Sequence, residues 1–441
     1  MSLGSALNSS VSGLKAQSAA IAVVSENIAN ASTTAYKKRE ISFESLVTSS
    51  NSASSINEIG GGVTFGTNQN MTEQGLIENT GVSTNIAIDG QGFFVVTDDP
   101  NNQPSGYTYT RNGDFSTNED GLLINNEGMI LLGQRTDENG NVLANNNSDL
   151  NSLEPIDLNA ISGVAGATTE VEMDINLPAD SSIYAGVGDP EYITSIEVFD
   201  ELGISHTIEQ TWRKTNVNEW TLTYADPYQT NLGAGSPATG TIAPATQVIT
   251  FNGDGSINEI DAAAAQPFNV TITGLTGTTG ANDLTFELDL GTQDQFDGLT
   301  QFASNTAVPD IEISSIEQDG VRFGQLSGVE VEDGGLVTAF FDNGVRRPIY
   351  QIPIATFSNP EGLTNVNGTI YDENERAGNF NLRLPGEGNA GGISATSLEL
   401  STVDTSEEFN KMIIAQQAYS SAAQIVSTVD EMFDTLIGAV R

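Results

Sequence analysis

The chain has 441 residues, which is too long for one hydrophobic core of ordinary size, so two or more domains are expected. Acidic residues outnumber basic residues by 58 to 15, and the formal net charge of -43 argues against binding to nucleic acid or anionic membranes. Cysteine is absent, which excludes disulfides and thiolate metal sites.

The first predicted element is a helix from Leu3 to Ile28. Its apolar residues recur every seven positions, at Leu7, Leu14, Ile21 and Ile28. A seven-residue repeat keeps one apolar seam facing a partner helix over several turns. The opening residues lack the basic start and apolar run of a cleaved secretory signal, and we expect none.

A polar turn and then a basic cluster follow this helix. The turn runs from Asn30 to Ala35, and the cluster is Lys37, Lys38 and Arg39. Because the chain is otherwise acidic, we interpret the cluster as a source of intersubunit salt bridges and not as a phosphate site. The next stretch, Ser49 to Gly62, is rich in Ser, Asn and Gly, which predicts a flexible connection.

The middle of the chain predicts strands and tight turns. Alternating or continuous apolar runs separated by Asp-Gly, Asn-Gly and similar turns begin near Gly75 and continue to Phe357. The predicted strands include Asn85–Ile88, Phe93–Val96, Tyr107–Arg111, Ile193–Phe199, Ser205–Trp212, Glu219–Tyr224, Val270–Thr273 and Leu336–Phe341. We therefore expect all-β domains between the two ends.

A second predicted helix runs from Glu407 to Val440. Met412, Tyr419, Val426, Phe433 and Val440 form one seven-residue row. Thr405 and Glu408 fit a capping box at its start. A polar stripe lies opposite the apolar rows, at Gln417, Ser420, Gln424, Ser427 and Glu431; it is either an ordinary solvated face or the lining of a channel.

Residues that could carry catalysis or bind metal are few. His206 is the single histidine, and we expect it to be a strand residue and no part of a triad. Asp137 begins a sequence like a calcium loop, but Val142 occupies the position where that loop needs glycine. No glycine-rich phosphate loop follows a strand and opens a helix. We expect no cofactor, no metal and no enzymatic activity.

Four separated stretches resemble the bacterial flagellar axial proteins, the rod and hook family. Asn27 to Lys37 is similar to the N-terminal signature of that family through Asn27, Asn30, Thr33, Tyr36 and Lys37, with Ala35 where glycine is usual. Ile86 to Phe94 and Tyr109 to Phe115 resemble its shared body, and Val403 to Leu436 its C-terminal helix. Val198 to His206, followed by Trp212 and Trp220, resembles an outer domain that hooks have and rods lack.

The resemblance implies a mainly β fold with α-helical termini. The terminal helices would form a coiled-coil-like inner layer, two separated segments a β body, and an inserted segment an outer β domain. The expected ranges are 1–70 for the N-terminal helix and linker, 71–148 and 296–392 for the β body, 149–295 for the outer domain and 393–441 for the C-terminal helix.

The implied function is that of a structural hook subunit. Its copies would polymerise into a curved, flexible tube that transmits motor torque and surrounds the export channel. The seven-residue rows would pack between subunits, and Gly386, Gly388, Gly391 and Gly392 would form a hinge. The implied partners are other copies, the rod, hook cap and hook–filament junction proteins, and the export apparatus, with neither nucleic acid nor membrane insertion.

The implied location is the flagellum outside the cell, reached by export without a cleaved signal peptide. Three alternatives stay open from the residues alone. The chain could be a distal rod-type axial protein, or a secreted acidic adhesin or surface-layer protein. A secreted polysaccharide hydrolase would need two carboxylates at a defined distance, which a sequence does not reveal.

Overall fold

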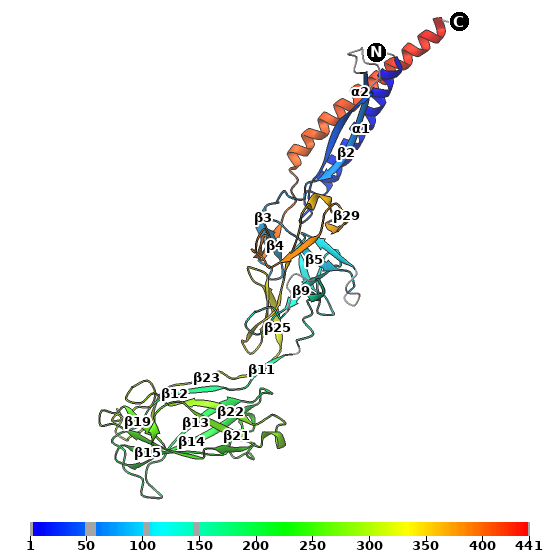
Figure 1. Ribbon diagram of the computed structural model, residues 1–441. Coiled ribbons are helices and arrows are strands. Elements are labelled where there is room, and N and C mark those ends of the chain that lie inside the picture. The colour runs from blue at the N-terminus through cyan, green and yellow to red at the C-terminus, as the bar shows by residue number, and fades with distance from the viewer. Residues whose placement is uncertain (1–2, 49–58, 100–105, 144–149, 162, 440–441) are drawn as a thin grey trace. The chain divides into compact units, whose positions relative to one another are not determined.

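The computed structural model describes residues 3–48, 59–99, 106–143, 150–161 and 163–439 (Figure 1). The chain divides into two compact units. Unit 1 comprises Met1–Ala160, Gly328–Ala339 and Arg346–Arg441, and unit 2 comprises Ile161–Ser327 and Phe340–Val345. Most elements are strands and a long helix lies near each end, which confirms the predicted fold class.

The two long helices of unit 1 pack against each other. They are α1 (Leu3–Ala29) and α2 (Thr405–Ala439), and their bounds lie within two residues of the predicted ones. Small buried side chains such as Ala16 and Ala20 on α1 and Ala415 on α2 allow the helices to approach closely. Neither helix, over the residues described, is long and apolar enough to cross a membrane.

A β-hairpin lies along α1 (Figure 1). Its antiparallel strands are β1 (Arg39–Thr48) and β2 (Ile59–Gln69). The sequence predicts helix and linker over 1–70 and does not indicate either strand. Of the predicted flexible connection, 49–58 lie outside the described residues and 59–62 begin β2. The alternation of apolar and polar residues in β1 is short and lies beside a Ser- and Asn-rich stretch, so the sequence pattern there indicates a linker and not a strand.

The β body of unit 1 is built from one large sheet and three small pairs. The large sheet has the order β25-β26-β27-β9-β5-β6-β30-β29, with β7, β8 and β10 at its side. The strands are β5 (Phe94–Thr97), β6 (Tyr107–Thr110), β7 (Phe115–Thr117), β8 (Leu123–Asn125), β9 (Ile130–Arg135), β10 (Glu154–Pro155), β25 (Leu326–Val331), β26 (Leu336–Phe341), β27 (Arg346–Gln351), β29 (Thr364–Asn367) and β30 (Ile370–Asp372).

Two of the three small pairs join early and late parts of the chain, and the third joins two late strands. They are β3 (Ile77–Asn79) with β33 (Ser397–Glu399), β4 (Ile86–Asp89) with β32 (Gly392–Ala395), and β28 (Ile354–Phe357) with β31 (Phe380–Arg383). Edge-to-face contacts join Phe93, Tyr109, Phe357 and Tyr371 in the core, with ring centroids 4.8 to 5.9 Å apart. Unit 1 therefore closes only when both ends of the chain are present.

Unit 2 contains a five-stranded sheet, a seven-stranded sheet and a short pair. The five strands are β17 (Thr241–Ala243), β21 (Phe268–Thr273), β22 (Leu284–Asp289), β12 (Glu170–Asn176) and β23 (Glu312–Gln318). The seven are β13 (Tyr192–Phe199), β14 (Ser205–Asn216), β15 (Glu219–Tyr224), β16 (Tyr228–Gln229), β18 (Thr246–Phe251), β19 (Ile257–Ile260) and β20 (Ala263–Ala264), and the pair is β11 (Val164–Gly166) with β24 (Val321–Gly324).

The core of unit 2 lies on one face of strongly alternating strands. Every second residue of β14 up to Lys214 is buried, as the period of a strand with one covered face requires. Trp212 and Trp220 are fully buried there, and both tryptophans of the protein therefore belong to unit 2.

Candidate functional site

The paired terminal helices cover only part of their apolar rows within one chain. Leu7, Leu14, Ile21, Ile28, Met412 and Val426 are partly buried. Tyr419 and Phe433 remain 43% and 39% exposed, and Val440 lies outside the described residues. The buried apolar positions are instead small or β-branched: Ala16, Ala20, Val23 and Val24 on α1, with Ala415 and Val429 on α2.

Further apolar side chains of α2 face solvent. Phe409, Ile413, Ile414, Ile425, Met432 and Ile437 are between 48% and 66% exposed. The segment from Met412 to Val429 also contains no charged residue, in a chain with a net charge of -43. Exposed apolar surface of this extent on an uncharged segment is typical of a protein-interaction site.

The predicted polar stripe of α2 is exposed along its whole length. Gln417, Ser420, Gln424, Ser427 and Glu431 are all exposed. At 100° per residue they lie on the side of the helix opposite the buried Ala415 and Val429. This placement suits both interpretations of the stripe, and its role as a channel lining stays a prediction.

The start of α2 is held to the end of α1 through a buried carboxylate. Asn27 Nδ2 donates to Glu408 Oε2 at 2.9 Å, and Lys411 Nζ donates to Glu408 Oε1 at 2.8 Å. Asn27 Oδ1 also accepts from the Arg39 amide at 2.9 Å and from the Tyr36 hydroxyl at 3.3 Å. One asparagine therefore fixes both helices and the first residue of the hairpin.

This geometry corrects the predicted capping box. The amides of Ser406 and Glu407 donate to Asp404 Oδ1, at 2.8 and 3.2 Å, so Asp404 caps α2 instead of Thr405. The Glu408 side chain takes no part in the cap and instead accepts a hydrogen bond from Asn27, which is 381 positions away in the sequence. A local motif could not indicate that contact.

A second buried network, centred on Glu399, lies where the helices of unit 1 meet its β body. Glu399 Oε1 accepts from Lys37 Nζ at 2.6 Å and from the Gly75 amide at 2.7 Å. Glu399 Oε2 accepts from Arg111 Nη1 at 3.3 Å. The side chains of all three ionic residues are at most 2% exposed.

Arg111 extends this network into the β body. Its Nε donates to the Gly92 carbonyl at 3.0 Å and its Nη2 to the Gly90 carbonyl at 2.6 Å. Its guanidinium also lies 5.5 Å from the centre of the Phe93 ring. The motifs around Lys37, Gly90 and Arg111, which are far apart in sequence, thus meet beside Glu399; we call Lys37, Arg111 and Glu399 the junction triad.

The junction triad holds two cations on one carboxylate, so it carries excess positive charge away from water. Burial, followed by the Arg111 charge, lowers the pKa of Lys37 to about 8, although Glu399 acts in the opposite direction. Keeping Lys37 in its ammonium form therefore lowers the stability of the folded state. Removal of the Glu399 carboxylate would leave two buried positive charges without a counter-charge.

The basic cluster is paired within one chain. Lys37 contacts Glu399 at 2.6 Å, Lys38 contacts Glu73 at 2.9 Å and Arg39 contacts Glu26 at 2.8 Å. The interpretation of this cluster as intersubunit salt bridges is therefore wrong. The partners lie in separate parts of the sequence, and a local reading of the cluster does not reveal them.

The turn after α1 uses the polar residues of the predicted signature. Asn30 Nδ2 donates to the Glu26 carbonyl at 2.9 Å, and Thr33 Oγ1 donates to Asn30 Oδ1 at 3.1 Å. Ala35 has a φ of 57°, is fully buried, and donates its amide to the Glu399 carbonyl at 2.8 Å. Alanine thus occupies a left-handed position that favours glycine.

The four glycines predicted as a hinge lie in the hydrogen-bonded connection from β31 to β32, and Gly392 is the first residue of β32. The Gly386 amide donates to the Gly391 carbonyl at 2.9 Å, and the Gly391 amide to the Gln91 carbonyl at 2.7 Å. A Cβ on Gly391 would lie 2.6 Å from the Asp89 carbonyl oxygen, whereas Gly392 has open space. Gly388 has a φ of 63°. A hinge here stays a prediction, and it would have to bend around these contacts.

Other candidate sites carry little chemistry. His206 lies buried in β14, with its ring nitrogens 2.9 Å from Thr239 Oγ1 and 3.1 Å from Asp200 Oδ2. Asp137 caps its own turn through the amides of Asn139 and Asn141. Within the described part of the chain, no cluster of three His, Asp or Glu side chains is placed to hold a metal ion.

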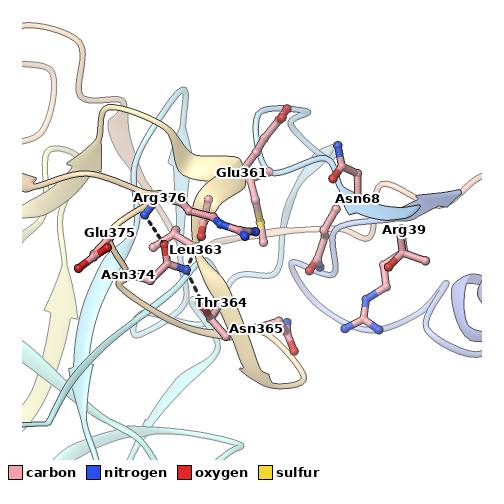
Figure 2. A pocket seen from close by; sticks show the side chains of 13 residues that line it. Arg39, Asn68, Glu361, Leu363, Thr364, Asn365, Asn374, Glu375 and Arg376 are labelled. Carbon is pink, nitrogen blue, oxygen red and sulfur yellow. Dashed lines mark hydrogen bonds between the residues drawn. The ribbon is translucent and has the colours of Figure 1, made fainter. Parts of the chain in front are cut away.

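An open, polar cleft of about 750 Å³ lies in unit 1 (Figure 2). It lies between the end of β2, the segment 361–365 that leads into β29, and the loop at 374–376, and Arg39 and Arg376 line it. Asn374 bonds to the walls of the cleft, at 2.5 Å to the Gly362 carbonyl and 2.7 Å to Thr364 Oγ1. Its mixed charges suit water and surface contacts better than a small ligand.

Family profiles match the chain in four successive segments. The profile described as flagella basal body rod protein matches residues 7–37, and that of the flagellar hook protein FlgE/F/G D1 domain matches 87–184. The flagellar basal body protein FlaE D2 domain matches 176–321, and the flagellar basal body rod FlgEFG protein C-terminal matches 394–439.

Whole-length relatives agree with these segments. The chain is 31% identical over 442 residues to the flagellar hook protein FlgE of Brucella suis biovar 1, with 100% of both chains covered. It is 28% identical over 601 residues to the flagellar hook protein FlgE of Caulobacter vibrioides, again with 100% of both covered. A crystal structure of Helicobacter pylori flagellar hook protein FlgE2 has a TM-score of 0.46 at 15% identity, covering 73% of this chain and 100% of that chain.

Proposed function

The chain belongs to the family of flagellar hook proteins and is a structural subunit of the hook, and from that premise we propose how its copies form a working tube. The subunit assembles into the hook polymer, outside the cell. In our proposal the polymer is curved and flexible, transmits motor torque to the filament and surrounds the export channel.

One observation supports the helices as the assembly surface: α2 exposes large apolar side chains along a segment without charge. Burying a large apolar side chain contributes roughly 1.5 to 3 kcal/mol before ordering costs. Tyr419 and Phe433, which are only partly covered in one chain, would gain cover from neighbours. The seven-residue rows thus serve two contacts, one within the chain and one between chains.

We also propose that the subunit consists of rigid domains joined by flexible links. The β body and outer domain would stay rigid while flexible links in the chain, including Gly386 to Gly392, adjust as the hook turns. Polar contacts between outer parts can exchange with water at small cost, which permits sliding.

The exposed stripe of α2 is proposed to line the channel. A polar surface on which Glu431 is the one charged residue offers little apolar area to which an unfolded export substrate would adhere. Replacement of Gln424 by leucine should then slow filament growth beyond the hook, measured as filament length. Normal filaments in that strain would favour a merely solvated stripe.

The proposed partners beyond further copies are the rod, the hook cap, the hook–filament junction proteins and the export apparatus. Support comes from the matches of both helical ends to rod-protein profiles, because a shared end would allow the hook to continue the rod. Export without a cleaved signal peptide belongs to the same proposal.

Negative-stain electron microscopy tests the central proposal. Purified intact chain should form curved tubes, whereas a chain trimmed of residues 1–35 and 405–441 should remain dispersed. Tubes of equal abundance from the trimmed chain would contradict assembly through the helices. Straight, rigid tubes from the intact chain would instead favour a rod-type role.

A further inference from the structure

One face of the β1/β2 hairpin is apolar and only half covered. Phe43 and Phe65 are partners in the register, so they lie side by side on the same face, with Ile41 and Val63 two residues away. We call these four residues the hairpin face. Phe43 is 46% exposed and Phe65 43%, while Ile41 and Val63 are partly buried.

The chain itself covers one end of this face. The Val63 amide donates to Ser12 Oγ of α1 at 3.1 Å, which places the start of β2 against that helix. The aromatic pair nevertheless remains half exposed. A two-stranded ribbon is marginally stable in water unless another element packs on it, so an additional cover would stabilise the hairpin.

A complementary surface lies on α2. Ile414, Ile425 and Met432 are 66%, 48% and 53% exposed. Their spacings of 11 and 7 residues place them on one side of the helix, about 100° from the buried Ala415. We call these three residues the α2 row. It spans about 27 Å at 1.5 Å per residue, against about 33 Å for the ten residues of β1.

Charge also favours contact between these two surfaces. Copies that each carry a net charge of -43 repel one another wherever acidic surfaces meet. The hairpin face and the α2 row contain no charged residue, and β2 has none at all. Glu40 and Glu44 of β1 lie on the opposite face of the hairpin, because side chains alternate along a strand.

We propose that the hairpin face of one copy is covered by the α2 row of a second copy in the hook polymer. The inference rests on the proposed assembly through the terminal helices and names a partner for that surface. The hairpin then binds α2 of a neighbouring copy and also packs against α1 of its own chain.

The absence of cysteine makes a direct test possible. A chain carrying Phe65→Cys is mixed with an isotope-labelled chain carrying Ile425→Cys, the mixture is polymerised in ammonium sulfate, and the polymer is oxidised. Disulfide-linked heterodimers are quantified by mass spectrometry. The matched control replaces Ile425→Cys by Gln424→Cys, the adjacent residue on the polar stripe.

We expect at least tenfold more heterodimer with Ile425→Cys than with Gln424→Cys. Equal yields, or in their place homodimers linked through the cysteines at position 65, would overturn the proposed contact. Tubes without the heterodimer count against this contact alone, whereas the absence of tubes from the unmodified chain counts against the proposed function as well.

A second variant avoids dependence on cysteine chemistry. Phe43→Thr with Phe65→Thr keeps residues suited to a strand, and it should raise the concentration needed for polymerisation at least tenfold. Glu44→Gln, on the opposite face, should leave that concentration unchanged. Polymerisation of the double variant at the unmodified concentration would refute the proposal.

Discussion

Replacing Glu399 with glutamine is expected to destabilise unit 1 selectively. The carboxylate accepts hydrogen bonds from Lys37, Arg111 and the Gly75 amide, and all of these groups are buried or part-buried. Glutamine preserves the shape but removes the negative charge and turns a donor toward one of the two cations. Two buried cations would then share no counter-charge.

The size of the effect follows from that loss. Removing one partner of a buried ion pair typically costs about 3 to 5 kcal/mol, because the remaining charge stays out of water. An exposed pair is worth at most about 1 kcal/mol. Arg135 and Glu154, whose side chains are 55% and 51% exposed, supply the matched control through Glu154→Gln.

Calorimetry of the monomer measures the effect with an internal reference. Because Trp212 and Trp220 both lie in unit 2, tryptophan fluorescence assigns the unfolding transition of that unit. Glu399→Gln should lower the transition temperature of unit 1 by roughly 6 °C or more and leave that of unit 2 unchanged. Glu154→Gln should leave both within about 2 °C.

Two results would refute the reasoning. A unit 1 transition in Glu399→Gln as stable as in the unmodified chain would mean that the junction triad does not hold the unit together. An equal shift in both units would mean that the substitution acts on the whole chain and not on this network.

Three further predictions concern the same region. Ala35→Gly should stabilise unit 1 by up to about 1 kcal/mol, measured by urea unfolding, because φ is 57° at this position; destabilisation would contradict the strain. Since the pKa of Lys37 is lowered to about 8 in the folded state and is higher when unfolded, the unfolded state binds the extra proton between pH 8 and pH 10. Stability should therefore rise over that window, by up to about 3 kcal/mol, and a Lys37→Met chain should lack this slope in unfolding titrations. Gly391→Ala should cost about 1 to 3 kcal/mol, because the new methyl group would meet a backbone carbonyl at 2.6 Å, whereas Gly392→Ala should be nearly neutral; equal melting temperatures would remove the steric argument.

The fold class could be predicted because it rests on local patterns. The seven-residue rows of both helices and the alternating runs such as β14 are visible in a few consecutive residues. The hairpin of β1 and β2 was missed, because one short alternating run beside a Ser- and Asn-rich stretch resembles a linker.

The junction could not be predicted for a different reason. Lys37 and Glu399 are 362 positions apart, and Asn27 and Glu408 are 381 apart. Nothing in the residues next to Glu399 marks it as buried and doubly paired. The resemblance pointed to the stretches around Lys37 and Arg111, but only the folded chain shows that their side chains share one carboxylate.

The long separation within the junction triad also sets an order of events in folding. A ribosome releases Lys37 early and Glu399 near the end, so the ion pair between them, like the pairing of α1 with α2, can form only after most of the chain has been made. Unit 2 draws nearly all of its residues from one continuous stretch and can fold without waiting. Until synthesis is almost complete, the junction triad of each subunit lacks Glu399, and the β body is not yet held to the terminal helices.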